Sequence, residues 1–160
     1  MNIFVLCTGR SGSTTFSRAC SHIQNFSVGH ESRGGFVEGR VNYPENHIEV
    51  DNRLSWFLGR LDQEYGDGAF YVHLKRNKQD TAESWTNPGF YEGTGIMRAY
   101  RTGILRPELR SSVKKDPDPI EVTKHYYDTV NANISLFLKD KTDWMTFNLE
   151  TAKSDFREFW

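Results

Sequence analysis

Short apolar runs, each followed by apolar residues at helical spacing, constrain the fold of this chain most. The runs cover residues 3–6, 47–50, 69–74 and 144–148. After the first run, Phe16, Ala19, Cys20 and Ile23 lie on one face of a helix that starts near Thr14. Strands that alternate with helices pair in parallel through right-handed crossovers. The sequence therefore predicts an α/β fold of three layers, with a mainly parallel sheet flanked by helices.

The later segments repeat this alternation. The run at 47–50 is a half-buried strand, and Asp51 or Asn52 caps a helix after it. A short helix over residues 77–85 follows the third run. Residues 86–118, rich in Gly, Pro and Arg, are expected to leave the core as an excursion. A long helix then begins at Asp118-Pro119, with Tyr127 and Val130 in its buried stripe.

Length and composition limit the number of domains and the class of partner. With 160 residues the chain fits one domain, residues 1–160. A net charge of −1 gives no global attraction to nucleic acid or to an anionic membrane, so neither is expected as a partner. No signal segment is evident, and Cys7 and Cys20 are expected to be buried thiols, which suits the cytoplasm. The oligomeric state is not predictable from the sequence.

The loop after the first run, "CTGRSGSTT" at residues 7–15, is suited to holding an anion. Helix N-termini present unsatisfied N–H groups, and glycines such as Gly9 and Gly12 let an anion approach the backbone. Arg10 adds a permanent cation. Hydroxyl donors come from Ser11, Ser13, Thr14 and Thr15. The Walker A spacing and its lysine are absent, which disfavours an ordinary ATPase or kinase. A tight turn with capping hydroxyls and no ligand is the plainer alternative.

A second segment narrows the kind of anion. "FYVHLKRNKQDTAESW", residues 70–85, places Arg76 after a strand and Ser84 eight residues later on a short helix. Taken together, the two segments resemble the sulfotransferases that use 3′-phosphoadenosine 5′-phosphosulfate (PAPS). The resemblance implies a P-loop NTPase-like fold and PAPS as donor, with 3′,5′-diphosphoadenosine (PAP) as product and no required metal. The family's Gly- and basic-rich segment has no counterpart before Trp160, so the domain is expected to lack C-terminal elements.

The nucleotide contacts that the resemblance implies fall on both segments. Those for the 5′ end are Arg10, Ser11, Gly12, Ser13, Thr14 and Thr15, and those for the 3′-phosphate are Arg76 and Ser84. Sulfuryl transfer also requires charge stabilisation on the leaving group, which suits Arg10, and a base for the acceptor.

Two residues in "SVGHESRGG" are candidates for that base. The resemblance favours Glu31, whereas His30 has the more convenient intrinsic pKa. Alternatively, both are loop residues that pair with Arg33 or Arg40. The remaining histidines, His22, His47, His73 and His125, lack metal-ligand spacing and are expected to be structural.

The sequence therefore favours a sulfotransferase that moves a sulfonate group from PAPS to a hydroxyl or amine of a small-molecule or glycan acceptor. Arg10, His30 and Glu31 are its predicted catalytic residues. Two alternatives stay open: a nucleotide phosphotransferase, which would bind ATP with Mg²⁺, and an inert nucleotide-binding module.

Overall fold

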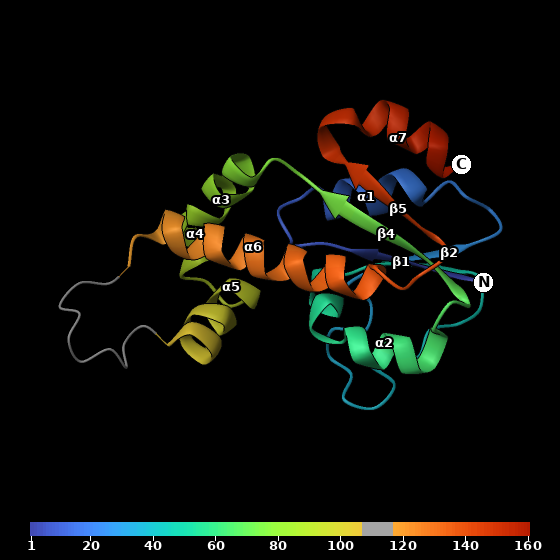
Figure 1. Cartoon of the computed structure of the whole chain (residues 1–160), viewed down its shortest axis with the longest axis horizontal. Coiled ribbons are helices and arrows are strands. Elements are labelled where there is room, and N and C mark those ends of the chain that lie inside the picture. Colours follow the sequence, from blue (N-terminus) through green and yellow to red (C-terminus); the bar gives the residue numbers. More distant parts are fainter. Residues whose placement is uncertain (107–116) are drawn as a thin grey trace. The chain divides into compact units, whose positions relative to one another are not determined.

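The computed structural model describes residues 1–106 and 117–160, and they form two compact units (Figure 1). The first unit consists of Met1–Arg76 and Val130–Trp160, and the second of Asn77–Thr129. The first unit contains the sheet and the predicted anion loop.

A five-stranded, all-parallel sheet organises the first unit. Its strands are β1 (Asn2–Leu6), β2 (Ser27–His30), β3 (His47–Val50), β4 (Ala69–Lys75) and β5 (Trp144–Asn148). They lie in the order β2-β3-β1-β4-β5. The register pairs Val5 with Val50 of β3 and with Val72 of β4, so β1 is the central strand. The predicted α/β fold with a parallel sheet is confirmed.

Helices cover both faces of this sheet (Figure 1). They are α1 (Ser13–Cys20), η1 (Asn52–Trp56), α2 (Leu58–Tyr65), the C-terminal part of α6 (Pro119–Leu138), η4 (Leu149–Thr151) and α7 (Ala152–Phe159). On one face Phe16 of α1 packs against Phe147 and against Phe156 of α7, with ring centroids 4.9 and 5.1 Å apart. On the other face Phe4 packs against Tyr65 of α2. Burial of these aromatic rings holds the three layers together.

Three expectations about the elements need correction. β3 is buried along its whole length, not half-buried, because it lies between β2 and β1 with layers on both faces. The sequence predicted no strand over Ser27–His30, which form the edge strand β2. In α6 the fully buried tyrosine is Tyr126, whereas Tyr127 is half-buried, and the buried stripe already includes Val122.

The second unit is helical and has an aromatic core. Its elements are α3 (Lys78–Thr86), α4 (Pro88–Tyr91), α5 (Ile96–Ala99), the π-helix η2 (Tyr100–Leu105) and the N-terminal part of α6. Trp85 and Tyr100 both pack edge-on against Tyr126. The excursion expected over residues 86–118 is thus largely helical where it is described, and residues 107–116 of it lie outside the described residues.

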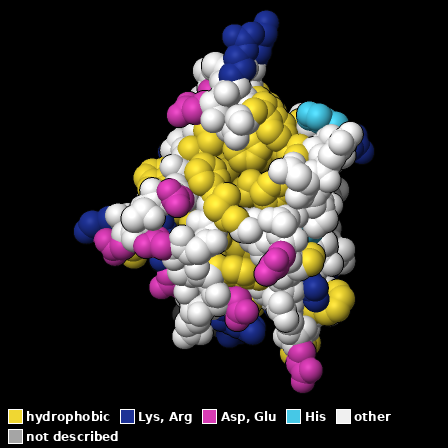
Figure 2. All heavy atoms as spheres, turned by 90° about the vertical axis from the view of Figure 1, so that its right-hand side faces the viewer, with side chains coloured by type: hydrophobic (Ala, Val, Ile, Leu, Met, Phe, Trp, Pro, Cys, Tyr) yellow, Lys and Arg dark blue, Asp and Glu magenta, His cyan; other side chains and the backbone are white. Residues whose placement is uncertain are grey.

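Some hydrophobic side chains reach the surface of the molecule. Figure 2 shows hydrophobic side chains on the face near which both termini lie in Figure 1.

Among the residues that the structure describes, no helix combines the length and apolarity needed to cross a membrane.

Strand order fixes where a ligand is expected. β1 continues through α1 to β2 on one side of the sheet, whereas its neighbour β4 continues toward β5 on the other side. The carboxyl ends of β1 and β4 therefore lie at a topological switch point, where open parallel sheets bind their ligands. The predicted anion loop and Arg76 both follow these two ends.

Candidate functional site

The loop between β1 and α1 turns sharply before the helix. Gly9, Arg10 and Gly12 all adopt left-handed backbone conformations, with φ of 70°, 55° and 94°. Such a conformation is strained in a residue with a side chain, so Arg10 is an outlier of the kind that gathers at functional sites. Gly12 is the N-cap of α1 and has no side chain with which to cap it. The first N–H groups of α1 are thus left for another acceptor.

Gly12 also has a packing role. A Cβ atom at this position would lie 2.7 Å from Cδ1 of Leu149 in η4. This contact and the φ of 94° account for the glycine without any ligand. The close approach of an anion to the backbone is therefore not the only reason for glycine at this position.

Ser11 differs from the other hydroxyl residues of the loop. Its side chain is fully buried, and within the described part of the chain Ser11 Oγ makes no regular hydrogen bond. The weakly bonding thiol of Cys7 lies beside it. Burial raises the pKa of that thiol to about 11, so Cys7 is an inert, buried group, as predicted for both cysteines. A buried hydroxyl without a regular partner is costly, and it suits a site that a ligand completes.

Two arginines lie together at the switch point. Arg76, directly after β4, donates from Nη1 to the carbonyl oxygen of Arg10 at 3.1 Å. Burial lowers the pKa of Arg10, and the positive charge of Arg76 lowers it further. The structure thus brings together the two segments that the sequence singled out 66 residues apart. An anion between two guanidinium groups would relieve their mutual repulsion.

His30, the last residue of β2, faces the start of α1. Its Nε2 atom lies 3.2 Å from Ser13 Oγ and 3.5 Å from Thr14 Oγ1. The imidazole is exposed, and so is Thr14. His30 therefore lies at the same helix N-terminus as the loop hydroxyls, with a ring nitrogen directed at them.

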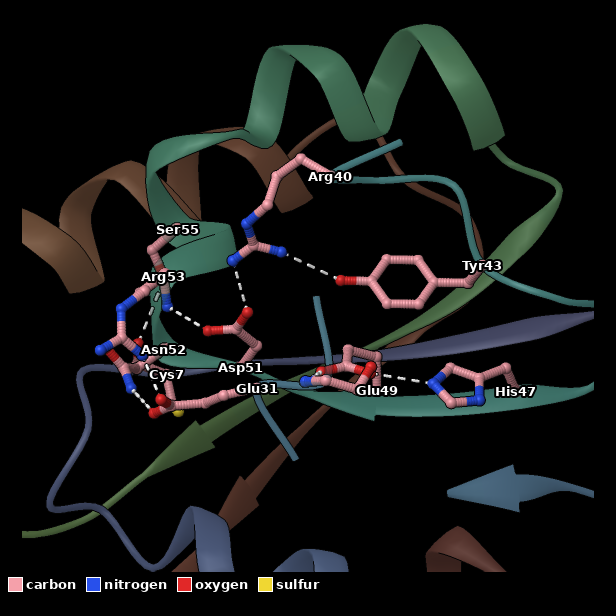
Figure 3. Close-up of polar contacts among 11 residues, drawn as sticks. Cys7, Glu31, Arg40, Tyr43, His47, Glu49, Asp51, Asn52, Arg53 and Ser55 are labelled. Atoms are coloured by element: carbon pink, nitrogen blue, oxygen red, sulfur yellow. Dashed lines mark hydrogen bonds and ion pairs between the residues drawn. The ribbon is translucent and has the colours of Figure 1, made fainter. Parts of the chain in front are cut away.

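Glu31 is held by a different set of partners. Its carboxylate accepts a hydrogen bond from Asn52 Nδ2 and forms an ion pair with Arg53, both in η1 (Figure 3). It does not pair with Arg33 or Arg40, which were its expected partners in the plainer interpretation. Glu31 also has a φ of 53°. Each of its carboxylate oxygens is thus engaged by a side chain of η1.

Arg40 and Asp51 form a buried ion pair behind this cluster (Figure 3). Arg40 Nη2 lies 2.5 Å from Asp51 Oδ2, and Arg40 Nη1 donates to the hydroxyl of Tyr43 at 3.2 Å. Asp51 Oδ1 accepts the backbone N–H of Arg53 and thereby caps η1, which confirms its predicted capping role. Burial raises the pKa of Asp51 in spite of hydrogen bonds from Arg53 and Arg40.

The sequence did not predict that Arg40 pairs with Asp51, or that Asn52 and Arg53 bind Glu31. The pairs join residues 11 to 22 positions apart, across loops without periodicity. A buried carboxylate at the end of a strand predicts that a cationic side chain pairs with it, but the sequence does not indicate which side chain.

The remaining predicted contacts lie apart from these groups. Thr15 is exposed on the first turn of α1, one residue beyond Thr14. Ser84 is half-buried on α3 and belongs to the second unit. Of the predicted residues, all except Ser84 lie at or after the carboxyl ends of β1, β2 and β4 in the first unit.

The chain thus has a parallel α/β unit with a cationic loop and an open helix N-terminus at its switch point. No family model, curated protein or solved structure matches it. Within residues 1–106 and 117–160, no group of three or more His, Cys, Asp or Glu side chains is placed to hold a metal ion.

Proposed function

We propose that this protein is a PAPS-dependent sulfotransferase that binds its donor at the carboxyl ends of β1 and β4. The hydrogen bond from Arg76 to the Arg10 carbonyl carries the proposal, because it joins the two segments on which the resemblance rests. The strand order supports it, since the switch point lies between those same strands.

The residues present suit an anionic donor. The open N-terminus of α1 and the guanidinium group of Arg10 bind and neutralise the 5′ end. The buried hydroxyl of Ser11 gains a partner when an oxyanion reaches the loop. Arg76 provides a second cation for the 3′-phosphate. Charge on the leaving phosphate is stabilised by groups that are already in position, which is the main contribution of this chain to the reaction.

Of the two candidate bases, His30 has the better placement. Its Nε2 faces Ser13 and Thr14, whereas the carboxylate of Glu31 is engaged by Asn52 and Arg53. A general base needs a free lone pair that can reach the proton of the acceptor. In the proposed reaction His30 accepts the proton of the acceptor, and Glu31 fixes the turn that follows β2.

Paired variants test this assignment. His30→Gln should lower the conversion of PAPS to PAP in the presence of an acceptor about 10²- to 10⁴-fold, the usual contribution of a general base, and leave PAP binding intact. Glu31→Gln should have the smaller effect on turnover. A larger loss of turnover in Glu31→Gln than in His30→Gln would identify Glu31 as the base.

The donor site is tested by calorimetry on Arg76→Ala. This variant should lose far more affinity for PAP than for adenosine 5′-phosphate, which lacks the 3′-phosphate, because a charge-assisted bond to one group is lost selectively. The control is Arg18→Ala, which removes an exposed arginine from the last turn of α1. Equal losses for both ligands would mean that Arg76 acts only by supporting the loop at Arg10.

A further inference from the structure

Three side chains at the opposite edge of the sheet form a continuous hydrogen-bonded relay. Ser27 begins β2 and His47 begins β3, and the parallel register places the two residues side by side. Ser27 Oγ lies 2.8 Å from His47 Nδ1. His47 Nε2 lies 2.9 Å from Glu49 Oε2 (Figure 3). This order, hydroxyl to imidazole to carboxylate, is the arrangement that activates a serine for nucleophilic attack.

The carboxylate of Glu49 determines which ring nitrogen of His47 carries the proton. Glu49 is fully buried, and burial alone would raise its pKa; hydrogen bonds from His47 and Ser32 outweigh that effect and hold the pKa below its usual value. An ionised carboxylate only accepts hydrogen bonds, so His47 must donate from Nε2. In the neutral ring Nδ1 is then the acceptor, and it faces the Ser27 hydroxyl.

Surrounding groups fix the imidazole in this orientation. The ring of Tyr43 stacks on it at 5.3 Å with an interplanar angle of 12°. The backbone N–H of His47 donates to Asn2 Oδ1 at 3.2 Å. Gly29 leaves room for Glu49, because a Cβ atom at that position would lie 2.4 Å from Glu49 Oε2. His47 is buried while Ser27 is exposed, so the base is protected and the hydroxyl is accessible.

We propose that Ser27 is an activated nucleophile that takes an acyl group from small activated esters, with His47 as its general base and Glu49 as a positioning residue. Ser27 Oγ bonds to the acyl carbon and its proton passes to His47 Nδ1. The bond from the acyl carbon to the leaving oxygen breaks, and the leaving group departs as an alcohol or phenolate. The proton on His47 then passes to the leaving group or to water.

The backbone near Ser27 limits which esters react. The N–H of Ser27 donates to the carbonyl oxygen of Asn46 at 2.9 Å, so this amide does not stabilise a developing oxyanion. An oxyanion donor is worth about 10²- to 10³-fold in rate. Ser27 therefore reacts with esters that have a good leaving group and not with ordinary alkyl esters. The relay lies at the amino edge of the sheet, so this inference is independent of the proposed sulfotransferase activity.

The test is to label the whole protein with p-nitrophenyl acetate at neutral pH and to quantify acetylated serines by peptide mass spectrometry. Ser21 is the matched control, since it is an exposed serine whose hydroxyl donates to the Arg18 carbonyl oxygen and not to a ring nitrogen. Ser27 should be acetylated about 10²-fold faster than Ser21, the lower end of a general-base contribution. Equal rates at the two serines would overturn the proposal.

Two further measurements bear on the relay itself. His47→Gln should reduce the acetylation of Ser27 to the rate of Ser21, and an undiminished rate would contradict the role of His47. Nitrogen-15 NMR of the histidine side chains in the wild-type protein should show that the neutral tautomer of His47 carries its proton on Nε2. A proton on Nδ1 would contradict the relay without any variant.

Discussion

Acidification should destabilise this protein through His73, a buried histidine of β4. His73 is 3% exposed and its Nε2 donates to Asn131 Oδ1 at 2.8 Å. Burial lowers its pKa from 6.5 to about 4, against the opposing effect of the Asn131 hydrogen bond. A depressed folded-state pKa means that the unfolded chain binds the proton first. The stability that neutral His73 contributes is thus complete above pH 6.5 and is lost as the pH falls toward 4.

The difference between the unfolded and folded pKa values of His73 sets the size of this loss of stability. At about 1.36 kcal/mol for each pKa unit, the loss of unfolding free energy reaches about 3 kcal/mol near pH 4. Urea titrations at pH 7, 6, 5 and 4 measure it, with His73→Gln as the control, because glutamine can donate to Asn131 but does not titrate. The wild type should lose about 3 kcal/mol more than the variant over this interval. Parallel pH dependences of the two proteins would refute the reasoning.

Two further predictions concern the site. Arg40→Met leaves the Asp51 carboxylate buried without its cation and should lower the unfolding free energy in urea by about 3–5 kcal/mol; adding Asp51→Asn should recover much of it, and an additive loss would contradict the ion pair. Gly12→Ala should cost about 1–2 kcal/mol, because an L-residue is strained at φ 94° and its Cβ approaches Leu149. If backbone strain dominates, adding Leu149→Ala should not restore the unfolding free energy of Gly12→Ala. Full restoration would mean that the contact with Leu149 causes the whole loss.

Local patterns predicted most of the fold. The apolar runs became β1, β3, β4 and β5, and the side chains of Asp51 and Asp118 each accept a backbone N–H of the helix that follows, as their places before η1 and α6 suggest. β2 was missed because its four residues, "SVGH", contain a single large apolar side chain. An edge strand of that composition is stabilised by pairing with β3 and not by its own pattern.

The candidate site was predictable in part. The loop and Arg76 could be expected together because carboxyl ends of parallel strands share one edge. The partners of Glu31 and Asp51 could not. Arg40 reaches Asp51 from the loop at 32–46, and Asn52 and Arg53 reach Glu31 from η1, and no periodicity in the sequence encodes either approach. Whether residues 1–160 act as one domain stays a prediction beside the two compact units that the structure describes.

Binding of PAP in the absence of a divalent metal tests the central claim most directly. In the proposed site, the guanidinium groups of Arg10 and Arg76 and the open N-terminus of α1 would supply the charge neutralisation that Mg²⁺ supplies in nucleotide phosphotransferases. Calorimetric titration with PAP in EDTA should therefore give a saturable, salt-sensitive heat, and ATP with Mg²⁺ should bind more weakly. Loss of PAP binding in EDTA, or tighter binding of ATP with Mg²⁺, would contradict a PAPS donor site at the β1 and β4 switch point.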